Sequence, residues 1–186
     1  MSVAGLGTAL AVVPVATPSA SAATGASAFE AAANSYQNAQ IASALAGAPD
    51  GVRVGANQVE WNDYSVVLTV PARASASVTP ADADTCPAPL IGFRWTCLYD
   101  GYQFSSRRLQ FKDAGFFQDI QHYGGARWIT LSWSNTRGQR TWLQQNASHQ
   151  DHGYEICLTG NSHAGSVRAP YLNARWIYLS DNYDHC

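Results

Sequence analysis

The segment FRWTCLYDGYQFSSRRLQF, residues 93–111, contains the pattern that decides the fold. Phe93 and Tyr99 are six positions apart, and because the side chains of a strand alternate between its faces, both point to the same face of an extended segment. Gly101 follows, with the permissive backbone that a tight fold-back requires. Residues 108–111 then alternate like a second short strand. The segment therefore predicts a strand, a tight turn and a returning strand.

A related unit occurs later in the chain, at a gapless offset of 48 residues. The heptapeptide ARWITLS at 126–132 returns as ARWIYLS at 174–180, with six of seven positions identical. The same offset aligns residues 109–111 with 157–159. Two copies are too few for a solenoid, so we expect two all-β units that close on each other. The repeated residues are interpreted as structural: Trp128, Ser132, Trp176 and Ser180.

Composition limits the remaining possibilities. The 186 residues suffice for one domain of ordinary size plus extra segments, and only 13% of them are charged. No cluster of Lys and Arg interleaved with aromatics occurs, which argues against a nucleic-acid partner. From Cys86 onward, runs of strand length alternate with glycine-rich turns, and no helical periodicity is sustained. This pattern is typical of a sandwich or barrel of Greek-key type.

All four cysteines lie in the last 101 residues. An even number in a small, loop-rich domain of an exported chain indicates disulfides. Three connectivities are possible, and the sequence alone does not decide among them. We favour Cys86–Cys97 and Cys157–Cys186, because each bridge then stays within one repeat.

The chain divides into four segments by composition. Residues 1–22 are small and apolar and end in an A-x-A type cleavage site, which predicts a signal peptide and a secreted product. Residues 23–72 form an N-terminal extension: a helix from Ala28 to about Ala46, then a β-hairpin that must lean on another part of the fold or be a removable pro-segment. Residues 73–85 are an Ala/Ser/Thr/Pro linker. Residues 86–186 are the main domain.

Few residues suggest catalysis or metal binding. His149 and His152 have a spacing that can bind zinc, but no second ligand pair is near in sequence, so a solvated loop is favoured. Arg127 and Arg175 precede the repeated tryptophans and either bind an anion or, as we favour, stack on the rings as packing. The tryptophans themselves either form a sugar-stacking platform or, for most of them, lie in the core. We expect no cofactor, no metal and no enzymatic activity.

The order of several short motifs resembles the secreted actinobacterial proteins of peptidase inhibitor family I36. These motifs are Cys97-Leu98-Tyr99, Gly101, the strand at 107–113, Ser132-Trp133 and Asn135. The spacing from Phe93 to Gly101 also resembles that of βγ-crystallins. The resemblance implies an all-β fold, in which two Greek-key motifs form a βγ-crystallin-like sandwich preceded by the helix and hairpin. Because Arg-Trp pairs stand where calcium-binding relatives carry Asn and Asp, no calcium site is expected.

The activity that the resemblance implies is inhibition of extracellular, thermolysin-like metalloproteases by a monomer. The protease would contact Cys157-Leu158-Thr159, with the disulfide anchoring the strand and Leu158 filling the enzyme's hydrophobic pocket. Burial of a leucine contributes roughly 1.5–3 kcal/mol. Leu158 is equally well interpreted as a buried strand residue beneath a bridge. The alternative function is a non-enzymatic crystallin-type module that binds at the cell surface or acts as a toxin.

Overall fold

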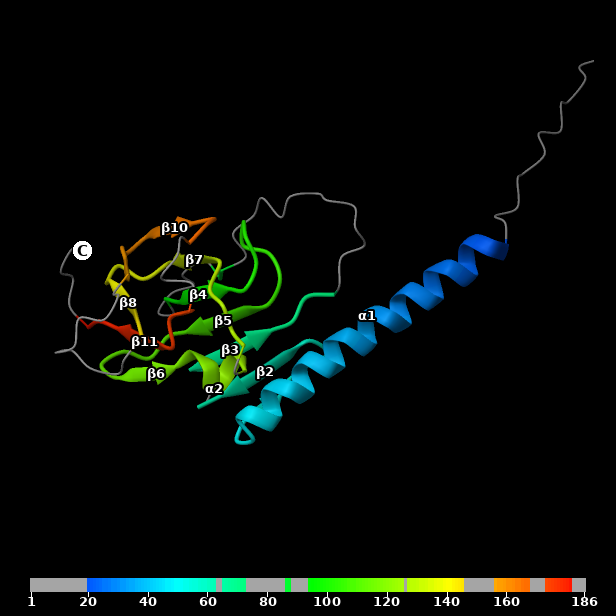
Figure 1. Ribbon diagram of the computed structural model, residues 1–186, viewed down its shortest axis with the longest axis horizontal. Coiled ribbons are helices and arrows are strands. Elements are labelled where there is room, and N and C mark those ends of the chain that lie inside the picture. The colour runs from blue at the N-terminus through cyan, green and yellow to red at the C-terminus, as the bar shows by residue number, and fades with distance from the viewer. Residues whose placement is uncertain are drawn as a thin grey trace, which may run out of the picture.

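The computed structural model describes residues 20–62, 65–72, 86–87, 94–125, 127–145, 156–167 and 173–181. Its strands form two antiparallel sheets, which confirms the all-β class (Figure 1). The larger sheet has seven strands in the order β1-β2-β3-β5-β4-β7-β10, and the smaller has four in the order β6-β11-β8-β9. Within the described residues, neither helix is long and apolar enough to cross a membrane.

The predicted N-terminal helix and hairpin are both present. Helix α1 spans Ala20–Gly47, so it begins at Ala20 rather than at the expected Ala28. Strands β1 (Val52–Arg53), β2 (Gln58–Trp61) and β3 (Val66–Thr69) follow it as an antiparallel set. The end of α1 is tied to this hairpin, because Trp61 Nε1 donates to the carbonyl of Ala48 at 3.1 Å.

We call residues 20–72 the arm, and the arm leans on the rest of the fold. Strand β3 pairs antiparallel along the whole of β5 (Arg108–Phe111), with Val66 opposite Phe111 and Thr69 opposite Arg108. Leu68 is fully buried in the same hydrophobic cluster as Leu109. The hairpin thus leans on the main body, which is the first of the two alternatives given for it. The predicted linker at 73–85 lies outside the described residues, and the segment boundaries stay predictions.

The main body consists of two interlocked halves. The first half contributes β5, β4 (Thr96–Tyr99) and β7 (Ser132–Asn135) to one sheet and β6 (Phe117–Asp119) to the other. The second half contributes β9 (Ile156–Leu158), β8 (Thr141–Gln144) and β11 (Trp176–Leu179) to that other sheet and returns β10 (Ser162–Ala164) to the first. Each sheet therefore holds three neighbouring strands of one half and one strand of the other.

The strand register corrects the repeat alignment at offset 48. Thr96 opposes Phe111 and Thr141 opposes Leu158, so Phe111 corresponds to Leu158 at an offset of 158 − 111 = 47. Ser132 lies opposite Tyr99 in the first half, and Trp176 lies opposite Gln144, the equivalent position of the second half. The offset between Ser132 and Trp176 is 176 − 132 = 44. Ser132 therefore corresponds to Trp176, and the predicted match with Ser180 is wrong. The two similar heptapeptides occupy different places, because the first ends at the first residue of β7 whereas the second contains the whole of β11.

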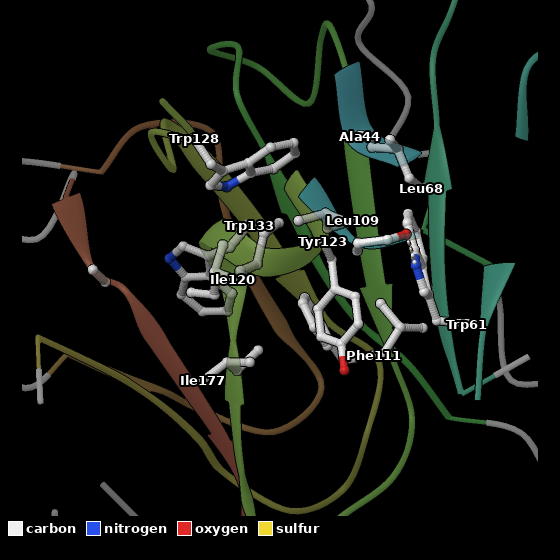
Figure 2. Packing of buried hydrophobic residues seen from close by; sticks show 14 of the residues in the cluster. Ala44, Trp61, Leu68, Leu109, Phe111, Ile120, Tyr123, Trp128, Trp133 and Ile177 are labelled. Atoms are coloured by element: carbon white, nitrogen blue, oxygen red, sulfur yellow. Dashed lines mark hydrogen bonds between the residues drawn. The ribbon is translucent and has the colours of Figure 1, made fainter. Parts of the chain in front are cut away.

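One hydrophobic core joins the two sheets, the arm and the short helix α2 (Ile120–Gly124). Figure 2 shows Trp128, Trp133 and Ile120 together near Ile177 of the smaller sheet, with Trp61 and Leu68 of the arm beside Tyr123. Trp128 and Trp133 are buried in the core, whereas Trp95, Trp142 and Trp176 are partly exposed, so the prediction that most of these tryptophans lie in the core is wrong.

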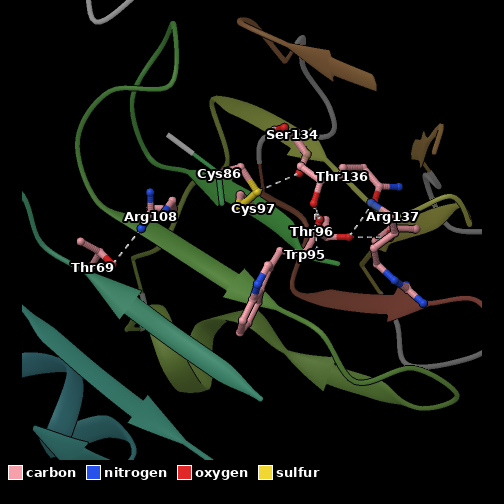
Figure 3. Close-up of a disulfide and its surroundings, with 11 residues drawn as sticks. Thr69, Cys86, Trp95, Thr96, Cys97, Arg108, Ser134, Thr136 and Arg137 are labelled. Atoms are coloured by element: carbon pink, nitrogen blue, oxygen red, sulfur yellow. Dashed lines mark hydrogen bonds between the residues drawn. A yellow bond between two sulfur atoms is a disulfide. The ribbon is translucent and has the colours of Figure 1, made fainter. Parts of the chain in front are cut away.

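A second, smaller cluster covers the opposite face of β4. It contains Cys86, Cys97 and Tyr99, with Trp95 and Phe104 packed against them. The predicted disulfide Cys86–Cys97 is confirmed, with its Cα atoms 5.8 Å apart (Figure 3). Strand β4 is thus buried on both faces. Cys157 is also disulfide-bonded, but Cys186 lies outside the described residues, so the second predicted bridge stays a prediction.

Candidate functional site

The predicted contact segment Cys157-Leu158-Thr159 has one residue in the core and one in solvent. Leu158 is fully buried among the core residues, and its backbone carbonyl accepts a hydrogen bond from Asn135 Nδ2 at 3.0 Å. Its side chain therefore has no path to an enzyme pocket in this structure, which corrects the interpretation that it inserts there. Cys157 is partly exposed and Thr159 is exposed.

Thr159 begins a braced turn that links β9 to β10. Ser162 Oγ donates to the carbonyl of Thr159 at 2.6 Å, and the Asn161 amide donates to the carbonyl of Arg137 at 2.8 Å. Asn161 has a φ of 52°, a left-handed conformation that asparagine tolerates better than most residues. A Cβ at Gly160 would collide with the backbone of Gly138, so this contact requires glycine. We call residues 159–161 the β9–β10 turn.

Buried polar side chains fix the strands beneath this turn. Thr96 and Thr141, which are equivalent in the two halves, share a hydrogen bond of 2.8 Å between their hydroxyls. Asn135 accepts from Thr96 Oγ1 at 3.2 Å and donates to the carbonyls of Gln139 and Leu158. Because these groups are buried and paired, any displacement of the turn would leave a polar atom without a partner.

Arg137 extends this network, because its backbone amide donates to Asn135 Oδ1 at 3.1 Å. Arg137 is 5% exposed, and its Nη2 atom donates to the carbonyl of Ser180 at 2.9 Å. Burial lowers the pKa of the Arg137 guanidinium from its ordinary value, and the nearby charge of Asp181 opposes that shift. Figure 3 shows Arg137 beside Thr96 and Thr136, with its side chain extending toward the neighbouring strand. Its main role is therefore to hold the 136–140 loop against the end of β11.

The residues interpreted as structural repeats have different roles. Ser132 is buried; its hydroxyl donates to the carbonyl of Gly101 at 2.6 Å and accepts from the Phe104 amide at 3.0 Å. Ser132 thereby fixes the fold-back after β4. Gly101 is required in the same fold-back, because a Cβ at this position would collide with Ser105. Ser180 is buried at the end of β11, and its amide donates to Arg140.

Arginine stacks on tryptophan in both halves, but in the first half the arginine is Arg107 and not the predicted Arg127. Arg175 lies 5.3 Å over Trp176 and forms an ion pair of 2.9 Å with Asp119. Trp128 instead receives Arg107, at 5.1 Å, while Arg127 is exposed. Arg107 also forms a 2.6 Å ion pair with Asp100, in which the two side chains are only 15% and 14% exposed. The sequence signal that was missed is the Asp at position 100 before the turn and the Arg at 107 after it.

No other described residues form an evident catalytic or metal centre. The His149–His152 pair lies outside the described residues, as does Phe93. Among the residues that are described, no three His, Cys, Asp or Glu side chains are placed to hold a metal ion.

Comparisons with known proteins give no further identification. No family model, no curated protein and no solved structure matches the chain.

Proposed function

We propose that this protein is a secreted, non-enzymatic inhibitor of extracellular metalloproteases, of the kind found in peptidase inhibitor family I36. Its two halves are proposed to be Greek-key motifs of the βγ-crystallin type. The exchange of one strand between the halves, β10 for β6, supports this fold assignment, because each motif then completes the other's sheet.

The observation that carries the functional proposal is the braced, exposed β9–β10 turn. Thr159 is exposed, whereas the residue before it is fully buried and the residue before that is disulfide-bonded. A segment held in this way loses little conformational freedom when a protease binds it, which favours affinity. Contact is proposed to run through Thr159 and the turn backbone, and not through the Leu158 side chain.

The mechanism requires no chemistry from this chain. The enzyme's active-site cleft receives the turn, and the hydrogen bonds from Ser162 and Asn161 keep the turn from relaxing into a cleavable conformation. Since β9 lies at the edge of its sheet among the described strands, the turn is sterically accessible.

Titration of a thermolysin-like protease with the full chain tests the proposal. We expect stoichiometric loss of activity for the wild-type chain. Thr159→Arg is expected to weaken inhibition at least about tenfold, equivalent to about 1.4 kcal/mol. Ser166→Arg is the matched control, because Ser166 is exposed but outside the turn.

Two outcomes would contradict the proposal. Absence of inhibition by folded wild-type chain would refute the protease-inhibitor function and favour the binding or toxin-like module. Equal inhibition by both arginine variants and the wild type would exclude the β9–β10 turn as the contact segment.

A further inference from the structure

A second surface lies on the arm, away from the β9–β10 turn in sequence. Strand β1 ends the seven-strand sheet, and within the described residues no strand pairs with its outer side. Val52 is 58% exposed and Val54 40% exposed, so this edge presents two aliphatic side chains to solvent. An open edge with exposed β-branched residues is a template for pairing with another extended chain.

A cavity of about 190 Å³ adjoins this edge. It is lined by Asp50, Val52, Glu60, Trp61 and Asn62. Val52 lies directly opposite Glu60 in the β1–β2 ladder, so their side chains share one face of the sheet. The cavity therefore begins beside the open edge and continues inward to a carboxylate.

Among the described residues, the cavity lining carries acidic but no basic side chains. Glu60 Oε2 is buried without a hydrogen-bond partner, a state that costs free energy unless a ligand supplies a donor. Asp50 Oδ1 lies 3.7 Å from His122 Nε2. Arg53, the adjacent residue of β1, is already bonded to Asn38, Gly55 and Ala56. The lining is thus electrostatically complementary to a cationic group.

We infer that the β1 edge and this cavity bind an extended segment of another protein that carries an arginine side chain. The segment would add to β1 as an outer strand, with its backbone groups pairing with the free edge. Strands lie about 4.8 Å apart, so a long side chain from the added strand lies over Val52 and directs its guanidinium toward Glu60 and Asp50. The planar guanidinium has several fixed donors, which suits the carboxylates of Asp50 and Glu60.

Fluorescence anisotropy with the full chain tests this inference. The probe is a labelled, end-blocked peptide of alternating threonine and valine with one central arginine, and the control peptide has glutamine in its place. We expect the arginine peptide to bind at least about tenfold more tightly. The preference is expected to shrink when the salt concentration rises from about 0.05 M to about 0.5 M, because charges near the surface are screened.

Variants test whether the preference for arginine comes from the cavity or from the acidity of the surface in general. Glu60→Gln keeps the shape of the side chain and is expected to remove most of the preference for arginine. Glu30→Gln removes an exposed acid of α1 and is the matched control, with no expected effect. Val52→Lys places a positive charge on the edge and is expected to abolish binding of the arginine peptide. Circular dichroism checks that each variant is folded.

The inference is overturned if both peptides bind equally, or if folded Glu60→Gln retains the full arginine preference. It is also overturned if neither peptide binds and sedimentation shows that the edge instead joins two copies of this chain. None of these outcomes bears on protease inhibition, which is measured separately and assigned to the β9–β10 turn.

Discussion

The two halves of the main body differ most at a pair of equivalent strands, β5 and β9. Both form the outer strand of a three-strand unit, and their residues Phe111 and Leu158 correspond in the ladder. The arm covers the outer side of β5, whereas β9 ends its sheet among the described strands. Of these two equivalent strands, β5 thus has its outer side covered and β9 has its outer side open among the described strands. The difference shows how an added segment makes two similar halves unequal and leaves one of them available for binding.

Removal of the arm is expected to have the largest effect on stability. The arm buries Val66, Leu68 and Val70 completely, and each such side chain contributes roughly 1.5–3 kcal/mol. A chain that begins at residue 86 is therefore expected to lose roughly 5 kcal/mol or more of unfolding free energy, and to expose the β5 edge to aggregation. Urea unfolding followed by tryptophan fluorescence measures the loss. An unchanged midpoint would show that the two edges are equivalent after all.

Substitution of Leu158 is expected to have the next largest effect. Because the side chain is fully buried, Leu158→Ala is predicted to destabilise the fold by about 2–5 kcal/mol. Inhibition by the fraction that stays folded is expected to be unchanged, since the proposed contact is Thr159. The comparison of urea midpoint and inhibition in one preparation checks both statements. Loss of inhibition at full stability would restore Leu158 as the contact residue.

A smaller effect is expected for the serine that braces the fold-back in the first half. Ser132→Ala removes two hydrogen bonds and leaves the buried Gly101 carbonyl and Phe104 amide short of a partner, which costs about 1–3 kcal/mol. Ser166→Ala, at an exposed position, is the control with little expected change. Because the ladder places Trp176 where the first half has Ser132, this brace is specific to the first half. Equal thermal stability of both variants would contradict that asymmetry.

The sequence predicted the strands, the first disulfide and the β-class well because these depend on local signals. Alternation at 108–111 and the glycine at 101 each act over a few residues, and the bridge between Cys86 and Cys97 was favoured because it stays within one half of the domain. The correspondence between the halves was wrong because it depends on cross-strand partners. A gapless alignment cannot follow connections of different length, and a slip of one residue moves a side chain to the other face of a strand. That slip placed Thr159 where Leu158 belongs.

Residues far apart in the chain explain the rest of what the sequence did not predict. The pairing of β3 with β5 joins segments on either side of the 73–85 linker, and no local pattern specifies it. The stacking of Arg107 on Trp128 similarly depends on how α2 and the turn meet. The network that braces the β9–β10 turn, from Asn135 and Arg137, became visible only in three dimensions.

The smallest expected effect concerns the contact between the arm and the first half at alkaline pH. Burial raises the pKa of the Tyr123 hydroxyl above its ordinary value, the negative charges of Asp50 and Asp119 add to the shift, and the hydrogen bond from Asn62 opposes it. Because the folded-state pKa is the higher one, the associated stability is fully present below the unfolded value of about 10 and is lost as pH rises through the folded value. Tyr123→Phe is expected to reduce this alkaline loss. Unfolding midpoints of wild type and variant between about pH 9 and about pH 11 measure the difference. Parallel curves would show that the packing of Tyr123 against Trp61 of the arm, 5.4 Å between ring centroids, opens before the phenol ionises.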